Sequence, residues 1–283
     1  MSSPWRRCSD EGIDGPAALS CIAMPGRITT EKRDGLAWIV FDHEARRNAI
    51  NDAMWDAIPD LVADLDADPE VRVVIMRGRG EVAFVSGADI SEFEKNRVGP
   101  AAREYDARNA RAFEALAEIS KPLIALVHGF CVGGGCAIAL NADLRFAADD
   151  AVFAIPAARL GLGYGSGGLE SLVGVVGLPA AKEIFFTARR FSAEEALSIG
   201  LVNRVLPKAE LDAFVETTAR QIAENAPLTL RSAKLILGQM GRPAGARDHA
   251  AQAQSIDDCY ASEDYAEGVR AFLEKRPPRF RGR

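Results

Sequence analysis

Apolar residues recur along the chain with two spacings, one typical of buried strands and one typical of helices. Short, largely apolar runs at 36–41, 71–76 and 123–127 predict buried β-strands, and shorter runs near 144–146 and 152–155 predict two more. Helical spacing predicts helices at 52–66, 101–118, a segment ending at 141, 211–225, 228–240 and 246–272. Strands and helices alternate in the first two-thirds and the last third is helical, so we expect an α/β fold with parallel strands and a helical C-terminal region.

The same pattern divides the chain into three parts. Residues 1–26 contain scattered Ser, Pro and Gly without a strand or helix period, so we expect a flexible N-terminal extension. Residues 27–206 are expected to form the α/β core, and residues 207–283 the helical C-terminal region.

Composition narrows the class of protein. The chain has 283 residues, 48% of them hydrophobic, and a formal net charge of -6, which fits a globular protein and argues against a dedicated nucleic-acid binder. It contains no apolar run long enough for a transmembrane helix, so no membrane partner is expected. Five scattered cysteines without a secretory signal favour a reduced, cytoplasmic protein, and three scattered histidines favour no metal site. The last 14 residues carry six Lys and Arg side chains against one Glu, which leaves room for a local anion site.

Three glycine-containing segments are candidate binding turns. Gly163–Gly168 matches G-x-G-x-x-G, but no long buried strand leads into it and no acidic residue lies at 188–190, about 20 positions after Gly168, so we reject a dinucleotide site. Gly133–Gly135 follows a buried strand and opens a helix, and Ser86–Asp89 forms a second turn between strand and helix. Backbone N–H groups at such turns can point at one ligand oxygen and form an oxyanion hole. The alternatives are close helix–strand packing and an ordinary loop.

Seven segments, in order along residues 27–280, resemble the enoyl-CoA hydratase/isomerase (crotonase) superfamily. They are Arg46–Ala49, Ala83–Ile90, Lys121–Cys136, Ala142–Arg145, Phe153–Pro156, Gly200–Val205 and Glu267–Arg276. The resemblance implies a crotonase-like spiral of ββα repeats with a helical C-terminal trimerisation region, assembled as a homotrimer or a dimer of trimers. It also implies an enzyme of fatty acid metabolism whose ligand is an acyl-CoA, with coenzyme A supplied by the thioester substrate and no cofactor bound permanently.

The resemblance assigns roles to individual residues. The backbone N–H groups of Ala88 and Gly134 would bind the thioester oxygen. The residues that would contact coenzyme A are Arg46, Arg47, Ala49, Ser86, Ala88, Asp89, Ile90, Phe272 and Lys275, the last two from the C-terminal helix and across a subunit boundary. Arginine suits phosphate because its guanidinium group binds such anions in a bidentate manner, although a solvated surface pair is the alternative for the two arginines.

The chain departs from the hydratases it resembles at both catalytic glutamates. One glutamate position is Ala137 and the other is Ala157. Each positioned acid or base typically contributes about 10²–10⁴ to a rate, so ordinary hydration of 2-enoyl-CoA is not expected. Stabilisation of a thioester enolate remains, and a lyase that loses CO₂ needs no protein base.

Two alternatives stay open beside this general prediction of an enolate-stabilising enzyme: a decarboxylating lyase and a binding protein. The Arg159–Tyr164 segment resembles methylmalonyl-CoA decarboxylase, in which a tyrosine lies beside the substrate carboxylate, so Tyr164 is a candidate catalytic residue or, alternatively, packs a loop. That decarboxylase has a histidine where this chain has Ala88. A non-catalytic acyl-CoA-binding protein is the alternative from another functional class. Glu170, His128 and the cysteines Cys131 and Cys136 are expected to be surface or structural groups.

Overall fold

The computed structural model describes residues 25–92 and 99–283. Nearly all of the expected extension at 1–26 lies outside the described residues. No helix among the described residues is both long enough and apolar enough to cross a membrane.

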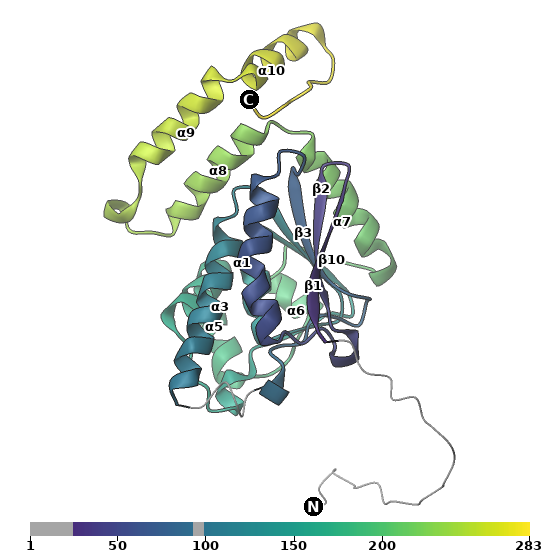
Figure 1. Ribbon diagram of the computed structural model, residues 1–283, viewed down its shortest axis with the longest axis vertical. Helices are drawn as coiled ribbons and strands as arrows, with labels where there is room; N and C mark the ends of the chain where they lie inside the picture. The colour runs from purple at the N-terminus through teal and green to yellow at the C-terminus, as the bar shows by residue number, and fades with distance from the viewer. Residues whose placement is uncertain (1–24, 93–98) are drawn as a thin grey trace, which may run out of the picture.

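A six-stranded sheet forms the centre of the described chain, and five of its strands run parallel (Figure 1). In spatial order these are β1 (Arg27–Arg33), β2 (Leu36–Asp42), β3 (Val73–Gly78), β5 (Leu123–Val127), β7 (Leu144–Ala148) and β10 (Arg204–Leu206). The expected strands and their parallel pairing are confirmed. The additional strand β1 pairs antiparallel with β2 through a turn at Asp34 and Gly35, both with positive φ as in a type I′ hairpin.

A second, smaller sheet continues from the carboxyl ends of the large one. Its order is β4 (Ala83–Val85), β6 (Phe130–Val132), β8 (Val152–Ala154) and β9 (Phe191–Ser192). Each of β3, β5 and β7 is followed by a strand of this second sheet and then by a helix. The chain therefore repeats a ββα unit three times, and the spiral predicted from the sequence is confirmed.

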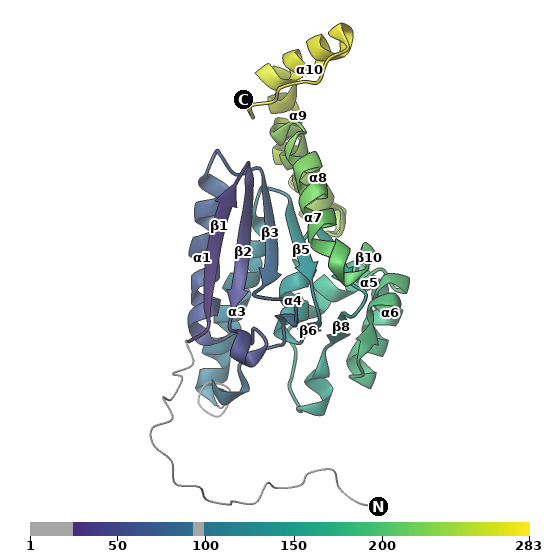
Figure 2. The ribbon, with the colours of Figure 1, turned by 90° about the vertical axis from the view of Figure 1, so that its right-hand side faces the viewer.

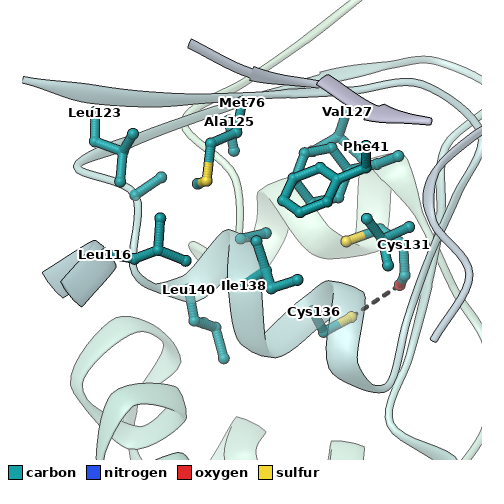
Figure 3. Close-up of a cluster of buried hydrophobic side chains, with 14 of the residues drawn as sticks. Phe41, Met76, Leu116, Leu123, Ala125, Val127, Cys131, Cys136, Ile138 and Leu140 are labelled. Atoms are coloured by element: carbon teal, nitrogen blue, oxygen red, sulfur yellow. Dashed lines mark hydrogen bonds between the residues drawn. The ribbon is translucent and has the colours of Figure 1, made fainter. Parts of the chain in front are cut away.

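Helices on one face of the sheets enclose the main core (Figure 3). They are α1 (Asp52–Ala67), α3 (Pro100–Glu118), α4 (Gly134–Leu140), α5 (Ser166–Thr187) and α6 (Ala193–Ser198). Helix α6 begins with a capping box at Ser192, with Glu195 as its reciprocal partner. Short 3-10 helices are η1 (Glu44–Arg46), η2 (Ile90–Glu92), η3 (Pro156–Arg159) and η4 (Ala244–Ala246).

Helix α7 (Lys208–Ala223) covers the opposite face of the large sheet (Figure 2). Its Leu211 and Val215 are buried in a second cluster that includes Trp38 of β2. The helix is also fixed by polar contacts, because Asp212 accepts hydrogen bonds from His128 Nε2 at 2.9 Å and from Arg77 at 3.0 Å.

The last three helices, α8 (Pro227–Met240), α9 (His249–Ala261) and α10 (Glu263–Glu274), project beyond the end of the sheet where β3 and β5 begin (Figures 1 and 2). Lys234 on α8 donates to the carbonyl oxygen of Lys121, just before β5, at 2.9 Å. The single helix expected over 246–272 is wrong. The helix breaks at Ser262, whose hydroxyl accepts from the Tyr265 N–H and caps α10.

Candidate functional site

Two turns meet where β4 and β6 end. The strands are parallel neighbours, so their carboxyl ends lie at the same edge of the small sheet. A Cβ placed on Gly87 would lie 3.4 Å from the carbonyl oxygen of Val132, and one on Gly133 would lie 3.9 Å from the Cα of Gly87. The Ser86–Asp89 turn and the Gly133–Gly135 turn are therefore in direct contact.

The backbone of Gly134 lies beside the amide nitrogen of Ala88, where these turns meet. A Cβ on Gly134 would lie 3.8 Å from the nitrogen of Ala88. Gly134 is the first residue of α4, so its N–H has no partner within the helix. The bridge between Ile50 and Ala88 uses the Gly87 oxygen and the Asp89 nitrogen, which leaves the Ala88 N–H outside that bridge. Both residues are partly exposed, so the pair is accessible to a ligand.

The neighbouring glycine has a different role. A Cβ on Gly135 would lie 2.0 Å from the carbonyl oxygen of Val85, so α4 packs directly on the end of β4. Figure 3 shows the Cys136 thiol pointing back toward β6, where it donates to the carbonyl oxygen of Cys131 at 2.8 Å. The sequence left two roles open for this glycine segment, helix–strand packing and ligand binding at a helix start. Gly135 has the packing role, whereas Gly134 is the first residue of the helix.

Arg46 ties the loop after β2 to the Asp89 turn. Its guanidinium group bonds to the Asp89 carboxylate and, at 2.7 Å, to the Ser91 hydroxyl. Burial alone would raise the pKa of Asp89, but hydrogen bonds from Ser91 and the charge of Arg46 outweigh it and hold the pKa below its ordinary value. Asp89 therefore stays ionised and holds the turn, and Arg46 is engaged by it. Ser86 joins the same contact, since its hydroxyl donates to the Arg46 carbonyl oxygen at 3.2 Å.

The adjacent Arg47 is oriented differently. It adopts a left-handed conformation, and its guanidinium carbon lies 4.9 Å from the centroid of the Phe130 ring. Ala49 is buried, and its carbonyl oxygen lies 2.9 Å from His43 Nδ1. Ile90 is exposed at the start of η2.

Methyl groups occupy both positions at which the resemblance predicts glutamates. Ala137 lies in the first turns of α4 and Ala157 in η3, and both are buried. The Ala157 carbonyl oxygen accepts from the N–H groups of Leu160 and Leu162, which closes the loop that leads to Tyr164.

Tyr164 is held by both ends of α5. Its ring packs edge-on against Phe185 with centroids 5.0 Å apart, and a Cβ on Gly168 would lie 3.1 Å from its Cε1. The side chain is partly buried against the main core. The loop-packing role weighed from the sequence is therefore present in the structure.

The other residues considered for chemistry, His128, Cys131 and Glu170, are structural or surface groups. His128 is buried and bonds to Asp212 of α7, and burial raises the pKa of the Cys131 thiol well above its ordinary value. A thiol with a raised pKa is a poor nucleophile. Glu170 is exposed on α5.

The two C-terminal candidates lie far from these turns within one chain. Phe272 and Lys275 belong to α10 and its end, beyond the amino ends of the sheet strands, whereas Ala88 and Gly134 follow the carboxyl ends of β4 and β6 (Figure 1). The structure brings the predicted residues of the loop after β2 and of the turns after β4 and β6 together, but places these two elsewhere.

Trp55 is a supporting residue that the sequence analysis missed. Its Cζ2 would lie 3.3 Å from a Cβ on Gly134, so the indole fills the space beside that backbone. Its Nε1 donates to the buried Tyr105 hydroxyl at 3.1 Å, and its ring packs edge-on against Phe113. In the sequence Trp55 is one apolar position of an amphipathic helix, and that pattern does not distinguish a side chain under a functional turn from any other core residue.

Comparisons with known proteins agree with the fold. The family model of enoyl-CoA hydratase/isomerase matches residues 31–283. The chain is 34% identical over 250 residues to the short-chain-enoyl-CoA hydratase of Clostridium acetobutylicum, covering 88% of this chain and 95% of that protein. It is 36% identical over 254 residues to the crotonyl-CoA hydratase of Syntrophomonas wolfei, covering 89% and 97%.

The solved structures agree as well. The crystal structure of an enoyl-CoA hydratase/carnithine racemase from Magnetospirillum magneticum matches with a TM-score of 0.87 at 33% identity, covering 90% of this chain and 96% of that one. A match across the family model and to relatives over nearly their whole length is far more than a shared fold. The chain belongs to the enoyl-CoA hydratase/isomerase family.

Proposed function

We propose that this protein binds an acyl-CoA thioester and that the N–H groups of Ala88 and Gly134 hold the thioester oxygen as an enolate forms. The observation that carries the proposal is the close approach of the Gly134 backbone to the Ala88 amide nitrogen, at two partly exposed residues. Two fixed donors aimed at a developing negative charge stabilise it without having to reorganise during the reaction. The ion pair of Arg46 with Asp89 supports this role, since it fixes the turn that presents Ala88.

The reaction we propose is that of a decarboxylating lyase rather than a hydratase. Hydration needs groups that activate water and move protons, and positions 137 and 157 carry methyl groups. Loss of CO₂ from a carboxylated acyl group needs no protein base. The bond between the carboxylate carbon and the α-carbon breaks, its electron pair passes to the α-carbon and the thioester oxygen, and the enolate is then protonated.

Tyr164 is the proposed partner of the substrate carboxylate or proton donor to the enolate. Its loop is closed by hydrogen bonds to the carbonyl oxygen of Ala157, one of the two glutamate positions, which supports a place near the acyl group. The relatives described above are named hydratases, so this is the point on which the proposal departs from them. A protein that binds acyl-CoA without turnover is the second candidate, and the two alanines favour it.

We further propose a homotrimer or a dimer of trimers. Large apolar side chains are exposed on the C-terminal helices, with Phe272 83% and Leu273 75% exposed. A 680 Å³ groove between α8, α9 and α10 is lined mainly by apolar residues. A second copy that covers these surfaces would bring Phe272 and Lys275 to its own bound coenzyme A. The free buried thiols of Cys131 and Cys136 fit the reducing cytoplasm that we propose as its location.

The test is a panel of CoA thioesters incubated with the purified protein and followed by mass spectrometry. We expect carboxylated acyl-CoA to lose CO₂ and crotonyl-CoA to remain unhydrated. Hydration of crotonyl-CoA at ordinary enzyme rates would show that the missing glutamates are not required. Unchanged decarboxylation by a Tyr164→Phe variant would remove the tyrosine from the mechanism, and binding without any turnover would establish the second candidate.

A further inference from the structure

A cavity of about 200 Å³ lies between the core and the start of the C-terminal helices. It is lined by residues just before β3 and β5, by the end of α1 and by the start of α8. Residues 281 and 282 run back from α10 to the same place, because a Cβ on Gly282 would lie 3.4 Å from Pro227 Cγ and 3.8 Å from Arg72 Nη1 (Figure 1). Segments far apart in the sequence therefore form one cavity.

Basic side chains outnumber acidic ones in this cavity. The basic residues that line it are Arg72, Lys121, Arg231 and Arg281, and the acidic ones are Asp66 and Asp68. Asp68 is already paired with Lys32 at 2.6 Å, and Asp66 accepts the N–H and the hydroxyl of Ser120 at 2.9 and 2.7 Å. Within residues 25–92 and 99–283, none of the four basic side chains forms an ion pair. The whole chain has a net charge of -6, so this positive excess is local.

The cavity also has hydrogen-bond donors to spare. Lys121 Nζ donates to the carbonyl oxygens of Leu65 at 2.6 Å and Asp68 at 2.5 Å, and an ammonium group has three N–H bonds. Arg72 donates from Nη2 to the carbonyl oxygen of Phe280 at 3.2 Å, and a guanidinium group has five. Both side chains can therefore keep their present contacts and still donate to a ligand.

The electrostatics of Lys121 reflect the same excess of positive charge. Burial lowers the pKa of its ammonium group, and the charge of Arg231 acts in the same direction, although Asp66 and Asp68 oppose it. Lys121 and Arg231 therefore repel one another, and an anion between them would relieve that repulsion. The start of α8 contributes too, because its N-cap Ala226 has no side-chain acceptor for the free N–H groups of the first turn.

We propose that this cavity binds a phosphate group, either as the free ion or as the terminal phosphate of a small metabolite. Its volume is several times the roughly 30 Å³ that one water molecule occupies in the liquid, which leaves room for a phosphate. Phosphate oxygens point in four directions and can meet donors from separate walls of the cavity, whereas a carboxylate presents two oxygens in one plane. Guanidinium groups suit such an anion because they bind it in a bidentate manner.

Bound phosphate would connect three parts of the chain. Arg72 immediately precedes β3 of the core, Arg231 lies in α8, and Arg281 lies in the segment that follows α10. A ligand that contacts all three holds the C-terminal helices against the core. The site lies before the amino ends of β3 and β5, whereas the turns of Ala88 and Gly134 follow the carboxyl ends of β4 and β6. It is therefore separate from the proposed acyl-CoA site and does not depend on that function.

The test is a ³¹P NMR titration of the full chain with inorganic phosphate, at an ionic strength held constant with sodium chloride. We expect Arg231→Gln and Arg281→Gln each to weaken binding about tenfold, as for loss of one charge-assisted contact at an exposed residue. Arg242→Gln is the matched control, since this exposed arginine follows the other end of α8. Arg47→Gln should also bind phosphate as the wild type does, because Arg47 lies outside this cavity.

A second titration with glycerol 3-phosphate identifies the source of the phosphate. Tighter binding of the ester indicates a metabolite, tighter binding of inorganic phosphate indicates the free ion, and either result supports the site. Thermal unfolding gives an independent readout, because phosphate should raise the wild-type midpoint more than sodium chloride of equal ionic strength does, and should raise that of Arg231→Gln less.

Three results would overturn the site. The first is a wild-type protein that binds neither phosphate nor its ester. The second is wild-type affinity in both Arg231→Gln and Arg281→Gln, and a loss in Arg47→Gln alone would then place the phosphate at the proposed acyl-CoA site. The third is an equal loss in Arg242→Gln, which would show a general effect of charge. Circular dichroism of each variant ensures that affinities are measured on folded protein.

Discussion

Replacing Ala88 with proline removes one amide N–H from the pair of donors while disturbing few other contacts. The bridge to Ile50 uses the oxygen of Gly87 and the nitrogen of Asp89, at 2.9 and 2.8 Å, so it does not depend on the Ala88 amide. The residue before the new proline is Gly87, which tolerates the restriction that proline imposes on its predecessor better than any other residue. Ala88→Gly is the control, because it shortens the side chain and keeps the N–H.

The expected effect differs between binding and chemistry. In the ground state a neutral hydrogen bond contributes about 0.5–1.5 kcal/mol, or roughly 2- to 13-fold in affinity. On the developing enolate, loss of one oxyanion donor costs about 2.7–4 kcal/mol, or roughly 10²–10³ in rate. Ala88→Pro should therefore lower kcat far more than it weakens substrate binding, and Ala88→Gly should change neither by more than a few-fold.

The assay has a readout that does not require turnover. Infrared difference spectroscopy of a thioester labelled with ¹³C at its carbonyl should show a lowered stretching frequency on binding to the wild type, because two donors polarise the bond. In Ala88→Pro the band should return part of the way toward its value in water. If the variant gives the wild-type band and turns over within threefold of the wild-type rate, Ala88 is not a donor and the proposed oxyanion site is wrong.

Three other expected outcomes follow from the contacts described above. Gly135→Ala should lower the free energy of unfolding by about 1–3 kcal/mol in urea denaturation, because its Cβ would lie 2.0 Å from the Val85 oxygen, whereas Gly163→Ala, with no atom within 4 Å, should stay within about 0.5 kcal/mol. Hydrogen bonds from Arg276 and from the Arg279 N–H lower the pKa of Glu267 from 4.5 to about 2, so the folded tail gains stability from this group above pH 4.5 and loses it as the pH falls toward 2. Glu267→Gln should abolish that acid-dependent part in melts at pH 2–6. Leu273→Glu should give monomers in analytical ultracentrifugation if the exposed face of α10 packs on another copy, and an unchanged assembly would place the interface elsewhere.

The sequence predicts those parts of the fold whose residues bury a continuous apolar side. The run Leu123–Val127 coincides with β5. Five consecutive apolar residues are typical of a strand that is covered on both faces of a parallel sheet, and all five are buried. Strand β1 lacks that signal, since its side chains are mostly polar and exposed, and its place follows from pairing with β2. The sequence does not predict the break at Ser262 either, because a serine that caps a helix cannot be distinguished by pattern from a serine on a helix surface. The structure identifies it as a cap, because its hydroxyl accepts a hydrogen bond from the Tyr265 N–H.

The sequence likewise predicts some parts of the candidate site and not others. The glycine turns are visible in the sequence because glycine at a strand–helix junction has a specific physical meaning. The roles of Arg46 and Arg47 are not, because adjacent residues of one type differ only in which partner each meets, Asp89 for one and Phe130 for the other.

The backbone amides at this site and the two alanines at the glutamate positions favour the same kind of reaction. If Ala88 and Gly134 are the donors that we propose, their backbone N–H groups act at any pH. The Asp89 carboxylate, which fixes one turn, stays ionised beside Arg46. The two positions that would carry proton-transfer groups are methyls, which add no charge beside the donors. Negative charge on a thioester oxygen is therefore favoured, while proton transfer from the family's usual positions is not. A substrate with a carboxylate on its α-carbon can form the enolate by losing CO₂. Its reaction is then stabilised by the proposed donors and does not require the two missing glutamates.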